Sequence, residues 1–312
     1  MDDPQPATQA PLAELEELLQ WVRRELVLRE EAPVGSWVED SANELRTGRK
    51  PGWFYPVADG GGVAFYNARR GQAYAHVHVG PGPAAAEHAR RLTESLLGAL
   101  PGSIRAIDIG FSGLPTDLER TLLEALARRP GSTVIARRAM ERALGPADGD
   151  PLPGTSRELA FVPVRRVTVE ALAELDRRAF EGSVDALLTG TEIEDYRRVL
   201  EALLGGQFGR LLDEASTTLY RSEPPRLIAA ILTTELSPRR AVFVEFLVDP
   251  EFRRQGLGRA LLRWGLRALW ALGYERVRLW VTDANVPART LYESAGFRVT
   301  ATAVIYRWDR PT

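Results

Sequence analysis

The chain has 312 residues, which is long for one domain, so about two domains of ordinary size are expected. Its formal net charge of −2 gives no reason to expect a nucleic acid or an anionic membrane as partner. Cysteine is absent, which excludes disulfides, thiolate metal sites and a cysteine nucleophile. We find no apolar run of about 18 residues and no signal-peptide pattern in residues 1–15, and therefore expect a cytoplasmic protein.

The three histidines, His76, His78 and His88, all lie in the first third of the chain. His76 and His78 would share one side of a strand, where packing is expected rather than metal binding. Any acid–base chemistry in the second half must therefore use Tyr, Asp, Glu, the backbone or water.

The first half is predicted to begin with two helices, at 12–26 and 36–46, because apolar residues recur there at helical spacing. A mixed pattern of strands and helices follows. Its strands are predicted at 53–57, 63–67, 73–79, 104–109 and 133–136, and its helices at 84–100 and 118–127.

Residues 145–156 are rich in Pro, Gly and Asp and have no apolar face. We expect 148–156 to link two domains, 1–147 and 157–312. In the second domain, strands are predicted at 159–167, 216–220, 227–234, 241–248 and 276–281, with one or two more at 297–308. Its helices are predicted at 169–180, 191–204, 255–272 and 286–295.

Both halves share one order of elements: two helices, three strands, helix, strand, helix, strand. This predicts an internal duplication of architecture. Strand–helix–strand pieces imply parallel pairing, whereas closely spaced strands imply hairpins. The sequence therefore predicts an α/β fold of two domains, each a mixed sheet with helices on its faces.

A basic, glycine-bearing turn joins the apolar strand 242–248 to the helix that follows it. The turn reads Arg253-Arg254-Gln255-Gly256-Leu257-Gly258. Its glycines let the backbone approach a ligand, and the start of the helix offers unpaired N–H groups to an anion. A turn with no ligand and a Rossmann-type dinucleotide turn are the alternatives, although Arg278 stands about where the latter needs an acid.

The arrangement Arg253-x-x-Gly256-x-Gly258, after a strand ending Leu247-Val248-Asp249-Pro250, resembles the acetyl-CoA pyrophosphate loop of the GNAT N-acetyltransferase superfamily. A second signature of that family stands at the expected distance: Asn285-x-x-Ala288-x-x-Leu291-Tyr292-x-x-x-Gly296-Phe297. The resemblance covers roughly 158–308. It implies two tandem GNAT-like domains, each a mostly antiparallel sheet splayed at the cofactor site, and acetyl-CoA (coenzyme A) as cofactor.

The resemblance also implies roles for individual residues around the cofactor. The pyrophosphate would be held by N–H groups of the turn, with added charge from its two arginines; these residues are Arg253, Arg254, Gln255, Gly256, Leu257, Gly258 and Arg259. The main chain of Leu247 and Val248 would pair with the pantetheine arm like an added strand. Asn285 would contact the same arm, and Tyr292 would point its hydroxyl at the thioester sulfur.

These roles suit direct acetyl transfer to an amine. A phenol is a sensible proton donor to a leaving thiolate, and the Val248 N–H is expected to meet the oxyanion. Tyr292 could instead only pack its helix on the sheet. Glu245 is our candidate for the base that deprotonates the amine, with a cross-strand ion pair as its alternative.

The acceptor is expected to lie against the connection 180–186, where Glu181 and Asp185 would suit a cationic amine, although acidic loops are commonly just solvated. We expect an N-acetyltransferase acting on a primary amine of a small molecule, as a monomer or a homodimer. The alternatives are a peptide or protein N-acetyltransferase and a non-catalytic acyl-CoA-binding module.

The counterpart turn of the first half reads His78-Val79-Gly80-Pro81-Gly82-Pro83. It has no arginine, and its prolines remove N–H donors. No second signature follows it. We therefore expect a degenerate first half that has lost the cofactor, a layout similar to that of tandem GNAT proteins such as mycothiol synthase.

Overall fold

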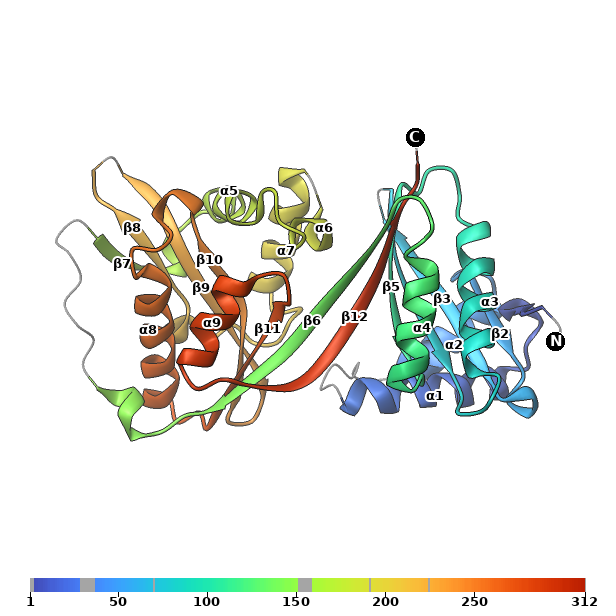
Figure 1. Ribbon diagram of the computed structural model, residues 1–312. Coiled ribbons are helices and arrows are strands. Elements are labelled where there is room, and N and C mark those ends of the chain that lie inside the picture. The colour runs from blue at the N-terminus through green and yellow to red at the C-terminus, as the bar shows by residue number, and fades with distance from the viewer. Residues whose placement is uncertain are drawn as a thin grey trace. The chain divides into compact units, whose positions relative to one another are not determined.

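The computed structural model describes residues 3–28, 37–69, 71–150, 159–190, 192–223 and 225–311. Most of the predicted linker, from 151 to 156, lies outside the described residues. The chain forms two compact units, which are unit 1 (Met1–Ala136 and Ala303–Thr312) and unit 2 (Arg137–Thr302). Each of them has a mixed sheet with helices on both of its faces (Figure 1).

Unit 1 has the strand order β1-β2-β3-β4-β5-β12. Its elements are β1 (Gln5–Pro6), α1 (Leu12–Leu28), α2 (Trp37–Arg46), β2 (Gly52–Tyr55), β3 (Gly62–Arg69), β4 (Gln72–Val79), α3 (Ala85–Gly98), β5 (Ala106–Ser112) and α4 (Thr116–Leu126). Alternate residues of β3 enter two cores, Ala64 and Tyr66 beneath α3 and α4 and Val63 and Phe65 beneath α1 and α2. A strand buried on both faces in this way holds the helices as layers on either side.

Unit 2 has the strand order β6-β11-β10-β9-β8-β7. Its strands are β6 (Ser132–Ala143), β7 (Leu159–Pro163), β8 (Thr217–Arg221), β9 (Arg226–Ser237), β10 (Arg240–Val248) and β11 (Arg276–Thr282). Its helices are α5 (Val169–Phe180), α6 (Ala186–Thr189), α7 (Ile193–Leu204), α8 (Leu257–Ala271) and α9 (Val286–Ser294). On β9, Ala229 and Ile231 face the core under α8 and α9, and Ala230 and Leu232 face the core under α5 and α7.

Two long strands pass from one unit into the other. β6 was predicted only as far as residue 136 but continues to Ala143, pairing antiparallel with β11. β12 (Arg298–Asp309) is a single strand whose last part pairs with β5, where Tyr306 and Trp308 join the core of unit 1. Unit 2 therefore begins earlier than the predicted boundary at 147, and the last residues of the chain belong to unit 1.

The parallel strand pairs of the two units differ at one end. In unit 2, β10 pairs with β11 only from Arg240↔Arg276 to Phe243↔Leu279, after which the strands part. In unit 1, β4 and β5 stay paired to their ends at His78↔Ser112. The splay that the resemblance implied for both domains is thus present in unit 2, whereas the counterpart strands of unit 1 remain closed.

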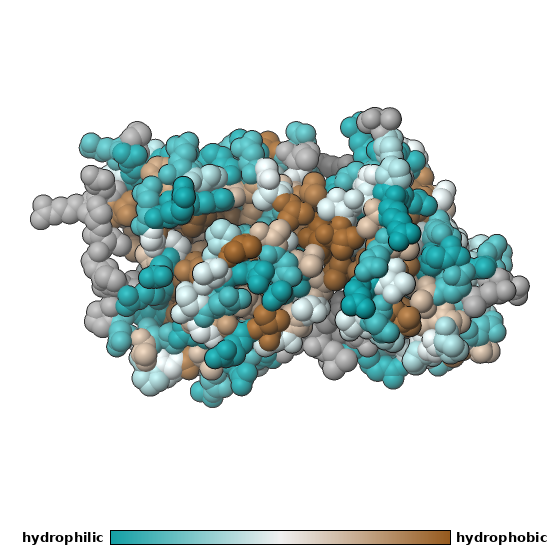
Figure 2. Space-filling model, viewed as in Figure 1, coloured by the Kyte–Doolittle hydropathy of each residue, from teal (hydrophilic) through white to brown (hydrophobic). Residues whose placement is uncertain are grey.

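Within the described part of the chain, no helix combines the length and the apolar character that crossing a membrane requires. On the face shown in Figure 2, hydrophilic residues cover most of the surface, and hydrophobic ones gather in smaller groups.

The part of β12 in unit 1 is expected to be needed for that unit's stability. Tyr306 is fully buried, and its hydroxyl hydrogen-bonds the Ser132 hydroxyl at 2.7 Å. Tyr306→Ala should lower the free energy of unfolding of unit 1 by about 3 to 5 kcal/mol, because it leaves a cavity. Urea unfolding followed by tryptophan fluorescence measures this. Val299→Ala, at an exposed position of the same strand, is the control, and equal losses in both variants would contradict the assignment.

Candidate active site

The parting of β10 from β11 begins at an irregularity in β10. Phe243 stands opposite Thr233 of β9 and Glu245 opposite Leu232, so Val244 is an extra residue on β10. Such a bulge bends a strand and re-aims the side chains beside it. Beyond it β10 continues along β9 alone, while β11 continues along β6 as far as Thr282. The half-buried Glu245 therefore lies where the two strands part, and the unpaired edges of β10 and β11 beyond this point are called the cleft below.

The backbone beyond the bulge turns polar groups toward this cleft. The Asp249 N–H donates to the Ile228 carbonyl of β9 at 2.8 Å. Because main-chain groups of successive strand residues point to opposite edges, those of Val248 and Phe246 face the side that β11 has left. The Leu247 main chain faces β9 instead. The geometry thus favours Val248 as a residue whose main chain can pair with a ligand, and it adds Phe246. Sequence reasoning missed Phe246 because it does not give the register of the strand.

The turn after β10 presents a row of N–H groups. Arg254 and Gly256 both have a left-handed backbone, with φ of 60° and 83°. Gly256 is the N-cap of α8 and has no side chain to cap it. Among the described residues, none accepts a hydrogen bond from the N–H groups of 254–259. A left-handed turn at the start of a 15-residue helix is a concave site for an anion.

Arginines fix the base of this turn. Asp249 is 1% exposed and pairs with Arg178 of α5 at 3.1 Å and with Arg226 of β9 at 2.9 Å. Its other oxygen accepts from the Glu251 N–H. The guanidinium of Arg253 donates to the carbonyls of Val248 and Ala179. Arg253 therefore joins α5 to β10 in this structure, and Arg254 supplies the exposed charge of the turn.

Helix α9 brings the aromatic residue of the second signature to the same cleft. Asn285 is its N-cap and accepts from the Ala288 N–H at 3.3 Å, so its oxygen has a structural role. Tyr292 is 5% exposed, and its ring meets that of Phe246 edge to face at 5.7 Å. It also packs on Phe297. The ring therefore packs α9 on the sheet. Its hydroxyl lies within the field of the Asp185 and Glu245 carboxylates.

Carboxylates gather around Tyr292 and Glu245. Burial raises the pKa of Glu245 to about 7, with Arg137 of β6 lowering it and Asp185 raising it. Burial, followed by the charges of Asp185 and Glu245, raises the pKa of Tyr292, so the phenol keeps its proton. The Asp185 carboxylate accepts from the Thr282 hydroxyl at the end of β11. The structure thus brings together three residues that the sequence analysis selected.

Two acidic residues in or directly after α5 depart from expectation. Glu181 does not join this group, because its carboxylate is 69% exposed and lies 3.7 Å from Arg177. Asp176 was not selected, yet it is 1% exposed, and the charge of Glu245 acts on its pKa. A sequence signal for Asp176 existed, since it occupies the apolar stripe of α5 with Leu172 and Ala179.

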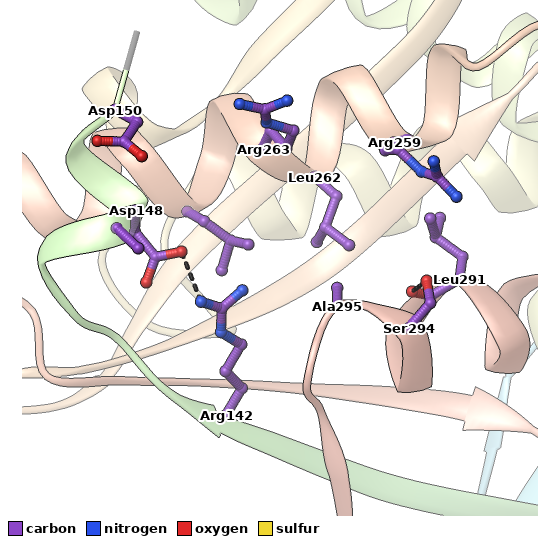
Figure 3. Close-up of a pocket in the computed structure, with 11 residues that line it drawn as sticks. Arg142, Asp148, Asp150, Arg259, Leu262, Arg263, Leu291, Ser294 and Ala295 are labelled. Atoms are coloured by element: carbon purple, nitrogen blue, oxygen red, sulfur yellow. Dashed lines mark hydrogen bonds and ion pairs between the residues drawn. The ribbon is translucent and has the colours of Figure 1, made fainter. Parts of the chain in front are cut away.

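A cavity of 420 Å³ lies between α8 and α9, and neither Glu245 nor Tyr292 lines it (Figure 3). Its lining combines an apolar floor with a charged rim and consists of Arg142, Ala147, Asp148, Asp150, Arg259, Leu262, Arg263, Leu266, Leu291, Ser294 and Ala295. Arg142 is paired with Asp148 at 2.5 Å. Arg259, in the first turn of α8, belongs both to this cavity and to the row of free N–H groups.

The corresponding place in unit 1 is filled by its own side chains. The Ser112 hydroxyl lies 2.8 Å from a ring nitrogen of both His76 and His78, across the closed end of β4 and β5. A Cβ at Gly80 would lie 2.2 Å from the Gly60 carbonyl, so the backbone is tightly packed there. The two histidines therefore connect β4 to β5, and His88 stacks on Tyr55.

Comparison with known proteins identifies the domain that carries this site. Residues 170–297 match the model of the Acetyltransferase (GNAT) family. This segment of unit 2 is therefore similar to a GNAT acetyltransferase domain. The match includes the splayed strands, the turn at Gly256 and Tyr292, which confirms the resemblance drawn from the two signatures.

Curated relatives match over part of their length. Mycothiol acetyltransferase of Propionibacterium freudenreichii is 43% identical over 103 residues, which is 32% of this chain and 33% of the relative. The [Ribosomal protein bS18]-alanine N-acetyltransferase of Escherichia coli K12 is 40% identical over 70 residues, which is 22% of this chain and 47% of that protein. The matched part thus spans about a third to half of these relatives.

Solved structures show the tandem fold. A GCN5-related N-acetyltransferase from Sphaerobacter thermophilus superposes with a TM-score of 0.63 and 15% identity, covering 97% of this chain and 95% of that one. A tandem GNAT protein from the clavulanic acid biosynthesis pathway has a TM-score of 0.54 and 16% identity, covering 99% and 98%. The layout of two GNAT-like halves is therefore confirmed along nearly the whole chain.

Proposed function

We propose that this protein is an acetyl-CoA-dependent N-acetyltransferase that transfers acetyl directly to the primary amine of a small molecule. One observation carries the proposal. In unit 2, β10 and β11 part beyond Phe243, and the segments that flank this parting supply the free N–H groups of 254–259, the Val248 main chain that faces away from β9, and the side chains of Glu245 and Tyr292. In unit 1, the corresponding strands are closed.

The residues present suit coenzyme A as a ligand. The N–H groups of 254–259 would hold its pyrophosphate, and the Val248 and Phe246 main chain would pair with the pantetheine amides. The cavity beside Arg259 would suit the nucleotide end, with an apolar floor for a base and guanidinium groups for phosphate. Arg253 is proposed to shape the loop rather than to contact phosphate, because its donors already serve two carbonyls.

The side chains at the bulge would transfer two protons during the reaction. When bound, acetyl-CoA supplies a thioester from which a C–N bond to the amine forms and the C–S bond breaks. Glu245 would accept a proton from the acceptor ammonium, and the Val248 N–H would meet the oxygen that gains charge. The Tyr292 hydroxyl would give its proton to the departing sulfur and regain one from the nitrogen. Asp185 would hold the ammonium near Glu245.

A peptide N-terminus is the second candidate acceptor. The observation in its favour is the match to a protein named as an N-acetyltransferase for alanine of ribosomal protein bS18. The mycothiol acetyltransferase matches favour a small molecule instead. Both acceptors present a primary ammonium to the same carboxylates, so only an acceptor panel separates them.

The proposed function is tested by coenzyme A release from acetyl-CoA with small amines, amino acids and peptides as acceptors. A thiol reagent can follow the release without background from the protein, because the chain has no cysteine. Turnover with small amines supports the proposal, and turnover with peptides alone supports the second candidate. Binding of acetyl-CoA without turnover across the panel would contradict both and indicate a non-catalytic module.

Gly256→Ala is expected to weaken acetyl-CoA binding about tenfold, because an L side chain strains the left-handed turn by about 1 to 2 kcal/mol. Gly273→Ala is a matched control at the other end of α8. Its φ of 79° resembles the 83° of Gly256, and a Cβ would find open space at both positions. Calorimetric titration should show the loss only for Gly256→Ala. Equal affinity in the two variants would place the pyrophosphate elsewhere.

Tyr292→Phe should lower kcat about 100-fold or more, because it removes a proton donor and keeps the ring that packs on Phe246. Acetyl-CoA affinity, measured by titration calorimetry, should change less than about threefold because ring packing is retained. A kcat that is unchanged at every pH would restrict Tyr292 to packing.

Glu245→Gln should remove the acidic limb of the pH–rate profile. In the unmodified protein, kcat/KM is expected to fall as pH drops below about 7, because protonated Glu245 cannot accept the ammonium proton. Steady-state rates from pH 5.5 to 9 test this. An unchanged limb in the variant would assign the base to another group.

A further inference from the structure

An acidic residue occupies a core position of α5. The buried face of this helix consists of Leu172, Ala173, Leu175, Asp176 and Ala179, so an apolar side chain would be expected where Asp176 stands. Asp176 is 1% exposed, and its Oδ1 has no hydrogen-bond partner among the described residues. A buried carboxyl without a partner is costly to the fold, and such groups commonly serve function.

The surroundings of Asp176 direct it toward the bulge of β10. The other residues of its stripe share one core with Val244, next to Glu245 on β10, and with Leu247, two residues beyond it. Glu245 is also the charged group that acts on the pKa of Asp176. From α7, the phenol of Tyr196 packs in the same core and lies within the field of Asp176. The Asp176 carboxyl therefore lies in the core between α5 and β10, on the side of the bulge that faces α5.

Two carboxyls in such an environment cannot both carry charge near neutral pH. Burial and then the Glu245 charge raise the pKa of Asp176 well above its ordinary value, and burial raises the pKa of Glu245 to about 7. The cleft edge, with Arg137 beside it, is the better place for a negative charge than the apolar core. Glu245 therefore loses its proton first, and Asp176 keeps one.

We propose that Asp176 is a positioning residue for Glu245, holding one proton behind the bulge and offering it as a hydrogen bond to the Glu245 carboxylate. This inference rests on the proposed function, in which Glu245 is the base. A donor from the core side would hold the carboxylate toward the acceptor while leaving its outer oxygen free to take the ammonium proton. It would also favour the ionised form of Glu245.

Other titratable and charged groups face this pair and must be considered in any pH profile. Around Glu245 they are Arg137 on β6, Asp185 after α5 and Tyr292 on α9. Near Asp176 the group is Tyr196. Burial and then the charge of Asp176 raise the pKa of Tyr196, and Arg177, Asp195 and Glu181 act on it more weakly. None of these other groups lies on the buried stripe of α5.

Asp176→Leu separates a positioning role from a structural one. Leucine suits the apolar stripe, so the urea midpoint of unfolding should stay equal or rise. Loss of the donor should move the acidic limb of kcat/KM up by about one pH unit, which lowers kcat/KM at pH 6 about tenfold. Asp176→Asn keeps a neutral donor and should restore the limb to within about 0.3 unit. Glu174→Leu, on the exposed side of α5, is the matched control and should leave the limb in place.

Three results would overturn the proposal: a limb that stays in place in Asp176→Leu, one that moves to lower pH, or an Asn variant that behaves like Leu. A downward shift would mean that Asp176 carries charge. Carbon-13 NMR of the labelled aspartate carboxyls, assigned with Asp176→Asn, tests the proton directly and requires no acceptor. Titration of Asp176 below pH 6 would contradict the proposal. Turnover that is absent from the unmodified protein would count against the proposed function instead.

Discussion

The loss of pairing between β10 and β11 beyond Phe243 is the feature on which the rest of unit 2 depends. Main-chain N–H and C=O groups inside a sheet are costly to leave unpaired, so two strands part only where something else can meet those groups. The extra residue Val244 starts the parting. The Asp249 ion pairs and the two carbonyls bound by Arg253 then hold β10 in its new direction.

The two units share one architecture but differ at the central parallel strand pair and at the turn that follows it. Both run through the same order of helices and strands, and both have a parallel pair at the centre of the sheet. In unit 1 that pair stays closed, with the Ser112 hydroxyl between two histidine rings. Prolines at 81 and 83 remove N–H donors from the turn that follows. The shared architecture is therefore compatible with both an open and a closed strand pair.

The sequence predicted most elements and the order of both halves, because periodicity and turn residues are local signals. It also selected Glu245, Asp185 and Tyr292, which the structure brings together. The exchange of β6 and β12 between units could not be predicted, since an alternating strand suits either sheet edge. The contacts of Arg253 also escaped prediction, because Ala179 is distant in sequence and adjacent only in the fold.

The charge balance at the bulge favours a cationic ligand over an anionic one. Beside Tyr292, burial raises the pKa of Glu245, the guanidinium of Arg137 lowers it, and repulsion from the Asp185 carboxylate raises it. An anionic acceptor would add to this repulsion, whereas an ammonium would relieve it and lower the pKa of Glu245 on entry. Arg137 comes from β6, the strand that continues out of unit 1. β6 therefore contributes a charge beside Glu245 as well as an edge to the sheet of unit 2.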